Sequence, residues 1–380
     1  MTHIINHKAI LESMQIALKA NDPSIADPAW KIVEMSFPYS TEMKLCIQDK
    51  IYHAEGDVWT HNKMIAQNLY DRGSSSNIQL LTTLYHDVAK PSTRLEIQEE
   101  NRIRISHPNH SRIGAQMAWA SMWMNNVLTV VDRIQVYKQI QWHQRAYHIW
   151  KNKDMKRAAL SYDCDANWND MIEFALCDNL GRISVAQQET IDSLHLLKMW
   201  LEENNVIGKV WKTPASRIFY FEKEGRDHHY QAREPTGSNV ILMSGLPGSG
   251  KDTYISNKLH GLPVVSLDSI RNEMKITHKD NQGPVIQAAL ELAKTYLRKK
   301  APFVWNSTNL TKMVRSKVID VCRAYDAYVS IHSMATDFNE CLKGNKNRIS
   351  SIPESAIFSM LEKWEPPSLT ESHEIHWIKR

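Results

Sequence analysis

A glycine-rich turn that ends in a lysine is the clearest chemical feature of this sequence. Gly245, Gly250 and Lys251 meet the spacing G-x-x-x-x-G-K, after an apolar run at 240–243 and before a predicted helix. Glycines let backbone N–H groups converge on a phosphate, and the lysine can reach the β- and γ-phosphates of a nucleotide. The pattern predicts a nucleotide-binding loop made of Gly245, Gly248, Ser249, Gly250, Lys251, Asp252 and Thr253.

The residue after the lysine departs from the usual pattern. This position is normally Ser or Thr, whose hydroxyl binds magnesium, but here it is Asp252, and Thr253 follows one step later. A carboxylate is also a hard oxygen ligand. We therefore expect the loop to bind ATP or another nucleoside triphosphate together with Mg²⁺ or Mn²⁺.

Charged residues follow the next predicted strand, at 262–267. Asp268 and Arg271 lie at its carboxyl end, where ligands bind in open α/β sheets. A carboxylate there could accept the proton of an acceptor hydroxyl during phosphoryl transfer, and an arginine could bind the acceptor's phosphate. Alternatively, Asp268 is a helix cap and Arg271 a surface cation. The basic segment 343–348 is typical of a lid whose arginine neutralises the transferring phosphoryl group.

A second set of candidate residues lies in the helical pattern of residues 53–200. It consists of histidines and aspartates, at His61, His86, Asp87, His110, His143 and Asp178. An adjacent His-Asp pair in an apolar helix is costly to bury unless a group such as a metal ion pairs with both side chains. Nitrogen and oxygen ligands without thiolate fit manganese, iron, nickel, cobalt or zinc, any of which would activate a water for phosphoester hydrolysis. Each histidine could also be an ordinary hydrogen-bonded core residue.

These residues need two different scaffolds to position them. A length of 380 residues favours two or three domains, and 42% hydrophobic with 23% charged residues is typical of a globular protein. We expect a multidomain chain with an all-α domain at 1–202, a linker at 203–237 with a short strand at 217–221, and an α/β domain with a parallel sheet at 238–380. Further strands are predicted at 301–306 and 328–334.

Charge and cysteine content narrow the possible functions. Residues 238–380 hold 19 Lys and Arg against 14 Asp and Glu, a net of +5, whereas residues 1–237 have a net of −1. A basic kinase half is consistent with a polyanionic substrate, and also with a solvated basic face. Five scattered cysteines without a C-x-x-C pair argue against a disulfide framework. With no long apolar run and no secretion signal, we expect a cytoplasmic protein without a membrane partner.

Residues 50–200 resemble the HD phosphohydrolase superfamily. The resemblance rests on the order His61, then His86-Asp87, then Asp178, with His110 and His143 matching the further histidines of dinuclear members. It implies an all-α HD-type domain in which these six residues hold one or two divalent transition metals, with Asp87 also catalytic.

Residues 238–380 resemble the 5′-OH polynucleotide kinase domain of phage and bacterial end-repair enzymes. The matching motifs are the phosphate loop, Asp268-x-x-Arg271, Ser307-Thr308-Asn309-Leu310 and Arg348. The resemblance implies catalytic roles for Lys251, Asp268, Arg271 and Arg348, with Asp268 as the general base and substrate contacts from Arg271 and Thr308. Two departures are Asp252 in the loop and Ser307, where the phage enzyme has an aspartate. An additional lid arginine of the phage pattern falls near Gly344 and is absent.

The two halves together resemble the bacterial HD-Pnk end-healing enzymes. This implies a bifunctional enzyme that phosphorylates 5′-OH ends of RNA or DNA and removes 2′,3′-cyclic, 2′- or 3′-phosphates, with a nucleic-acid ligase acting downstream. Two alternatives stay open: an HD nucleotide phosphohydrolase fused to a small-metabolite kinase, and a regulator whose nucleic-acid binding is gated by ATP.

Overall fold

The computed structural model describes residues 4–100, 102–277, 279–348 and 351–379. The chain divides into two compact units, Met1–Lys209 and Val210–Arg380. Within the described residues, no helix combines the length and the hydropathy needed to cross a membrane. All five cysteines are free thiols, as expected.

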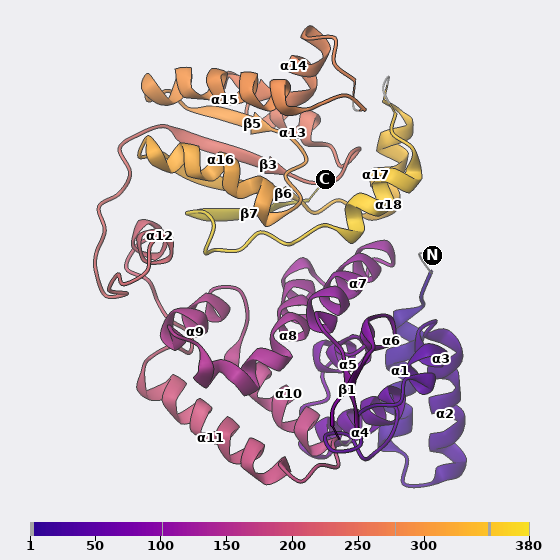
Figure 1. The fold of residues 1–380 in the computed structure, drawn as a ribbon. Coiled ribbons are helices and arrows are strands. Elements are labelled where there is room, and N and C mark those ends of the chain that lie inside the picture. Colours follow the sequence, from indigo (N-terminus) through magenta and orange to yellow (C-terminus); the bar gives the residue numbers. More distant parts are fainter. Residues whose placement is uncertain (1–3, 101, 278, 349–350, 380) are drawn as a thin grey trace. The chain divides into compact units, whose positions relative to one another are not determined.

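The first unit is mainly helical, as the sequence predicts (Figure 1). Its helices are α1 (His7–Lys19), α2 (Pro23–Ser36), α3 (Ser40–Leu45), α4 (Val58–Asp71), α5 (Asn77–Tyr85), α6 (Lys90–Thr93), α7 (His110–Met124), α8 (Val130–His148), the short 3-10 helix η1 (Ile149–Lys151), α9 (Met155–Asp163), α10 (Trp168–Leu180) and α11 (Gln187–Glu203). Helices α4, α5, α7, α8 and α10 pack on one another around buried tryptophans such as Trp119 and Trp168.

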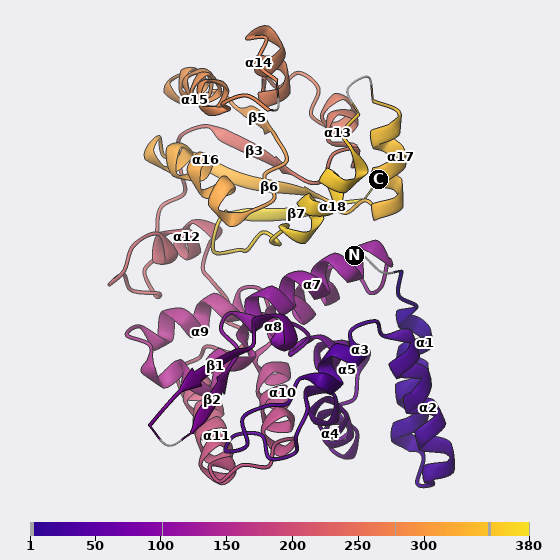
Figure 2. The same cartoon turned by 45° about the vertical axis from the view of Figure 1, so that its right-hand side comes forward.

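The expectation that this unit is all-α is wrong in one respect. Strands β1 (Leu95–Gln98) and β2 (Ile103–Ser106) form an antiparallel hairpin (Figure 2). Each strand has only four residues, and Leu95 and Ile103 are more than half exposed. Runs this short and this poorly buried leave little trace of a period-2 pattern in the sequence.

The apolar helix expected around the His86-Asp87 pair ends earlier than its sequence pattern suggests. Helix α5 ends at Tyr85, His86 is its C-cap residue, and the chain turns before α6 begins at Lys90. The His86-Asp87 pair therefore lies at the end of a helix rather than inside one, where its side chains can turn toward neighbouring helices.

The second unit is a parallel sheet with helices on both faces. Its elements are α12 (Pro214–Glu222), β3 (Asn239–Ser244), α13 (Lys251–Lys258), β4 (Val264–Ser266), α14 (Leu267–Glu273), α15 (Gly283–Arg298), β5 (Phe303–Asn306), α16 (Lys312–Ala324), β6 (Tyr328–Met334), α17 (Phe338–Lys346), α18 (Glu354–Glu362) and β7 (Glu374–Ile378). The strand order is β4-β5-β3-β6-β7, with every pair parallel. The parallel α/β class and the strands predicted at 262–267, 301–306 and 328–334 are confirmed.

Alternation along β3 assigns its side chains to two cores. Val240 and Leu242 pack in a cluster with residues of α15 and α16, whereas Ile241 and Met243 pack with residues of α13. Because β3 is buried on both faces, it appears in the sequence as a continuous apolar run. Its central place in the sheet puts the loop that follows it between the ends of β5 and β6.

The strand predicted over 217–221 is wrong, because these residues belong to helix α12. Thr213 caps the helix by accepting a hydrogen bond from the Ser216 backbone N–H, and Pro214 occupies the first turn. These are helix-start signals. The run of isoleucine and aromatic residues that follows favours a strand by propensity alone, but the cap and the burial of Ala215 and Ile218 on one helix face outweigh it.

Three arginines hold the segment that leads into β7. Arg315 is fully buried, forms a bidentate pair with Glu371 at 2.8 and 3.0 Å, and donates to backbone carbonyls of residues 309, 310 and 365. Arg217 donates to the carbonyls of residues 369, 372 and 373, and Arg323 to that of Glu371. Residues 365–373 contain no helix or strand, so these bonds replace the ones a regular element would supply.

Replacing Arg315 by Met is expected to destabilise the second unit by about 3–5 kcal/mol, because Glu371 becomes a buried carboxylate without its partner. Urea unfolding of the full chain, followed by a probe in the second unit, measures the change. Lys294→Met removes an exposed pair with Glu291 and should cost at most about 1 kcal/mol. An equal loss of unfolding free energy in the two variants would contradict a stabilising role for the buried Arg315–Glu371 pair.

Candidate functional sites

The six predicted metal ligands come together in the first unit. They lie on or directly after four helices and at the start of a fifth: His61 on α4, His86 and Asp87 after α5, His110 at the start of α7, His143 on α8 and Asp178 on α10. All are buried, and His110, the most exposed, is 8% accessible. Two sets of three, His61/His86/Asp87 and Asp87/His110/His143, each place one ligand atom per residue within 4.8 Å of one another.

Backbone carbonyls set the orientation of the histidines. The Nδ1 atoms of His86, His110 and His143 each lie 2.6–2.9 Å from the carbonyl oxygen three residues earlier, and Nδ1 of His61 lies 2.9 Å from the Gly181 carbonyl oxygen. A carbonyl only accepts, so each Nδ1 carries a proton and donates it. The Nε2 atoms are then left to face the cluster with their lone pairs, which is the orientation of a metal-bound histidine.

The Nε2 and carboxylate atoms face one another at short range. Nε2 of His61 lies 2.8 Å from Asp178 Oδ1, and the Nε2 atoms of His110 and His143 lie 3.2 Å apart and 3.4 and 3.7 Å from Asp87 Oδ1. Among the described residues, His86 Nε2 and both Asp87 oxygens have no partner in hydrogen-bonding geometry, although Lys90 Nζ lies 2.7 Å from Oδ2. Buried acceptors that face acceptors are costly without a cation between them, so this donor set fits a divalent metal ion.

The protonation states are those that a metal site requires. Burial lowers the pKa of His143 to about 3 and also lowers the pKa of His110, so both imidazoles are neutral near pH 7. Burial raises the pKa of Asp87, but positive charge nearby, including the Lys90 ammonium, outweighs it and holds that pKa well below its usual value. The Arg182 guanidinium does the same for the pKa of Asp178 against its burial. His110 and His143 are thus neutral nitrogen donors beside ionised carboxylates.

Tyr147 and Glu55 also contact this cluster and escaped the sequence analysis. The Tyr147 hydroxyl donates to Asp178 Oδ2 at 2.7 Å, beside the guanidinium of Arg182, which pairs with the same carboxylate. Glu55 lies 3.3 Å from Nδ1 of His61. Neither residue stands at a spacing that marks it in the sequence, because both contacts depend on tertiary packing.

In the second unit, the glycine-rich loop has the backbone conformation that glycine allows. Gly245, Gly248 and Gly250 all have positive φ, and Gly250 is the N-cap of α13. Lys251 Nζ donates to the carbonyls of Gly245 and Leu246, each at 2.9 Å, and burial lowers its pKa to about 8. The lysine thus lies folded over the loop, in reach of a phosphate bound there.

Asp252, the unusual residue of the loop, has a partner on a neighbouring strand. The side-chain amide of Asn306, the last residue of β5, donates to Asp252 Oδ1 at 2.7 Å. The amide fixes one carboxylate oxygen and leaves the other for a cation, as a hard oxygen ligand. Thr253 follows on the exposed side of α13, and the Thr308 backbone oxygen accepts a hydrogen bond from the Gly245 N–H.

Asp268 lies between the two predicted arginines. Arg271 Nη1 is 2.5 Å from its Oδ1 and Arg348 Nη2 is 3.4 Å from its Oδ2, while Arg271 Nε also donates to Gln282. Asp268 is in the first turn of α14, directly after β4, as the pattern predicts. The structure therefore brings together a carboxylate and two guanidinium groups in the unit that carries the phosphate loop.

Helix α17 touches the phosphate loop through a contact between glycines. A Cβ added at Gly344 would lie 2.3 Å from the Gly248 carbonyl oxygen, and one added at Gly248 would lie 2.1 Å from the Cys341 carbonyl oxygen. The Thr336 hydroxyl also donates to the Ser249 carbonyl at 2.7 Å. The position where the phage pattern has a further arginine thus holds a residue small enough for helix and loop backbones to meet.

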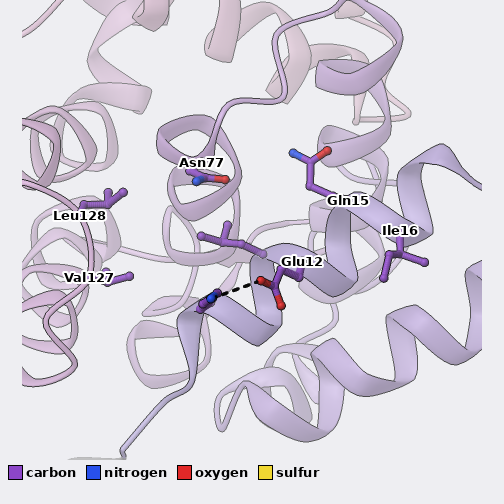
Figure 3. Close-up of a pocket in the computed structure, with 8 residues that line it drawn as sticks. Glu12, Gln15, Ile16, Asn77, Val127 and Leu128 are labelled. Atoms are coloured by element: carbon purple, nitrogen blue, oxygen red, sulfur yellow. Dashed lines mark ion pairs between the residues drawn. The ribbon is translucent and has the colours of Figure 1, made fainter.

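A surface cavity of about 660 Å³ lies in the first unit (Figure 3). It is lined by α1 residues such as Leu11 and Ile16, by Asn77, and by Val127 and Leu128. None of the predicted ligands lines it, and the Lys8–Glu12 pair at its edge is 3.9 Å apart and exposed. We assign it no function.

Comparison with known proteins identifies the second unit in part. Residues 240–367 match the AAA domain family AAA_33. An L-seryl-tRNA(Sec) kinase of Methanococcus maripaludis is 26% identical over 136 residues, 34% of this chain and 53% of the relative. A bifunctional polynucleotide phosphatase/kinase of Schizosaccharomyces pombe is 22% identical over 159 residues, 40% of this chain and 36% of the relative. The chain thus spans about half or less of the length of these two relatives.

A solved gluconokinase from Sinorhizobium meliloti 1021 aligns with 39% of this chain and 84% of its own, at 18% identity and a TM-score of 0.29, a value too low to establish a shared fold. The family match and the phosphate loop are sufficient for a coarser conclusion. The C-terminal part of the chain is a P-loop kinase-like domain with homology to a polynucleotide kinase and to a seryl-tRNA kinase.

Nucleotide affinity is expected to depend on pH through Lys251. Its pKa of about 8 in the free protein must rise when phosphates bind beside it, so the stabilising charge is present below pH 8 and is lost above it. The Kd for Mg·ATP should be constant between pH 6.5 and 7.5 and increase by up to about tenfold per pH unit above 8. Calorimetric titration measures this. Lys251→Arg should bind with no such dependence, and a flat profile for the unsubstituted protein would contradict the prediction.

Replacing Gly344 by Ala should weaken nucleotide binding. The added methyl group meets backbone rather than a flexible side chain, so α17 and the loop must separate, at a cost of about 1–3 kcal/mol. We expect the Kd for ATP to increase about 10- to 100-fold. Lys343→Ala, on the same helix at an exposed position, is the matched control and should leave the Kd unchanged.

Proposed function

We propose that this chain is a bifunctional enzyme that heals nucleic-acid ends, with a kinase centre in the second unit and a metal-dependent phosphoesterase centre of the HD type in the first. The observation that carries the proposal is that one chain holds both a phosphate loop and a separate buried cluster of four histidines and two aspartates. Each handles phosphate, and neither needs the other for its chemistry.

In the kinase centre, the loop backbone and Lys251 bind the phosphates of ATP, and Asp252, held by Asn306, would be a ligand for Mg²⁺ or Mn²⁺. Asp268 accepts the proton of a 5′-hydroxyl as that oxygen bonds to the terminal phosphorus of ATP and ADP leaves. Arg271 holds the acceptor's phosphate and Thr308 the acceptor strand, and Arg348 stabilises the charge of the phosphoryl group in transit.

Nucleic acid is favoured as the acceptor over a small metabolite. The names of both curated relatives give substrates made of nucleic acid, a polynucleotide and a tRNA. The net charge of +5 over residues 238–380 agrees with a polyanionic acceptor. RNA or DNA ends are the proposed substrates, and the healed ends are those a ligase joins.

In the phosphoesterase centre, His61, His86, Asp87, His110, His143 and Asp178 would hold one or two divalent metal ions. Bound metal would lower the pKa of a water and offset the charge of a 2′,3′-cyclic, 2′- or 3′-phosphate. Lys90 and Arg182 keep Asp87 and Asp178 ionised by pairing with them, and the backbone carbonyls hold each imidazole in the ligand tautomer.

Two point variants test the proposal in the full chain. Lys251→Ala should lose at least about 100-fold in the labelling of a 5′-OH oligonucleotide with γ-labelled ATP, while it still removes phosphate from a 3′-phosphorylated oligonucleotide. Asp87→Ala should show the reverse pattern and lose bound metal, because it supplies a ligand to both sets of three.

Lys258→Ala in the last turn of α13 and Asp71→Ala at the end of α4 are the matched controls and should retain both activities. If the chain leaves the oligonucleotide unlabelled but transfers phosphate from ATP to a small hydroxyl compound, the result would favour a metabolite kinase. If the chain binds the oligonucleotide without phosphoryl transfer, and Asp268→Ala binds it equally well, the result would favour the ATP-gated regulator.

A further inference from the structure

Glu55 is a buried carboxylate next to the histidine cluster. It lies in the loop before α4, and its side chain is 1% exposed. It accepts hydrogen bonds from His53 Nδ1 at 2.7 Å and from the Ile183 backbone N–H at 2.9 Å, and its Oε1 lies 3.3 Å from His61 Nδ1. Two hydrogen-bond donors from separate segments of the chain thus converge on Glu55, and Nδ1 of His61 lies beside the same carboxylate.

His61 has a carboxylate beside each ring nitrogen. Glu55 and the Gly181 carbonyl face Nδ1, and Asp178 Oδ1 faces Nε2 at 2.8 Å. The groups at Nδ1 only accept, so Nδ1 carries a proton and the Nε2 lone pair of a neutral ring points at an ionised oxygen. A cation at Nε2 removes this repulsion, and it also makes the Nδ1–H group more positive, which strengthens its hydrogen bond to Gly181 and its electrostatic attraction to Glu55.

The charges of the cluster leave Glu55 without a cationic partner of its own. Asp87 pairs with Lys90 and Asp178 with Arg182, whereas the ion pairs of the described residues join Glu55 only to His53 and His61. Within the described residues, no Lys or Arg side chain pairs with Glu55. A buried carboxylate is stabilised by a nearby positive charge, and a cation held at Nε2 of His61 would supply one across the imidazole ring.

Glu55 also connects the first ligand to the chain that follows the last one. The Ala54 N–H donates to the Ile183 carbonyl at 3.0 Å while Glu55 accepts from the Ile183 N–H, so residues 54–55 hold the chain five residues after Asp178. The carbonyl of Gly181, in the same stretch, accepts from His61. Glu55 thus anchors the stretch after α10 whose Gly181 carbonyl orients His61.

We propose that Glu55 is a positioning residue for the metal centre, which orients His61 and increases its basicity so that the affinity for a divalent cation depends on the Glu55 charge. The inference rests on the proposed metal-dependent function of the first unit. It adds an outer carboxylate to the six predicted ligands.

Glu55→Gln tests the proposal, because it keeps the size and a hydrogen-bonding oxygen but removes the charge. Calorimetric titration of the metal-free full chain with Mn²⁺ should show a Kd about 10- to 100-fold higher than without the substitution. 5′ kinasing should be unchanged, and the melting temperature of the metal-free protein measures separately any stability lost with the hydrogen bond to His53 or to the Ile183 N–H.

Controls separate this inference from the function on which it rests. Glu173→Gln breaks the Arg72 pair in the same unit and should leave the Mn²⁺ affinity unchanged. Glu55→Asp keeps the charge and should bind Mn²⁺ more tightly than Glu55→Gln. An unsubstituted chain that binds no Mn²⁺ would overturn the proposed phosphoesterase. The role of Glu55 alone would be overturned by normal Mn²⁺ affinity in Glu55→Gln, by an equal loss of Mn²⁺ affinity in Glu55→Gln and Glu55→Asp, or by failure of these two variants to fold.

Discussion

The first unit depends on the burial of carboxylates and imidazoles that cannot satisfy one another. Five segments from α4 to α10 supply them, and packing of these helices brings lone pairs and negative charges within 2.8–3.9 Å. Lys90 and Arg182 offset the charge of Asp87 and Asp178, and backbone carbonyls take up the Nδ1 protons. What remains is a set of acceptors that needs a cation, so the same packing that closes the helical core also defines the candidate metal centre.

The second unit positions its chemistry by sheet topology. Parallel strands place their carboxyl ends on one edge, and the ends of β3, β4 and β5 bring the glycine-rich turn, Asp268 and Asn306 to that edge. Because β3 is central, its flanking strands supply partners on both sides of the loop. The contact of Gly344 with Gly248 then brings α17 to the loop backbone, and Arg348 follows two residues after that helix ends.

Local patterns were sufficient to predict the parts of the fold that are locally encoded. The phosphate loop, the parallel strands and the mainly helical first unit each carry a spacing or a period that survives without tertiary information. The helix at 214–222 was mistaken for a strand because aromatic and β-branched residues outweighed the Thr213 cap in the sequence pattern. The β1–β2 hairpin was missed because two four-residue strands hardly establish a period.

The candidate sites also divide into residues that the local sequence marks and residues that only packing brings to the site. The six candidate histidine and aspartate ligands could be selected because their order along the chain matches a known series, but only the folded structure shows that they converge. Tyr147 and Asn306 could not be selected from the sequence, since each contacts a residue at least 30 positions away. Glu55 lies near His61 in the sequence, but no spacing marks it as a partner. Outer partners of a site are defined by packing, and packing is the property that a single sequence specifies least directly.

The arginine contacts to residues 365–373 have a consequence for how the second unit forms. Arg217 in its first helix bonds to carbonyls 152, 155 and 156 residues further along, next to the start of β7. Such distant partners meet late, because closing a long loop costs entropy before any bond compensates it. Until they meet, β6 has an unpaired edge, with backbone groups open to a strand of another molecule. The step most exposed to intermolecular misassembly is thus the docking of the last strand.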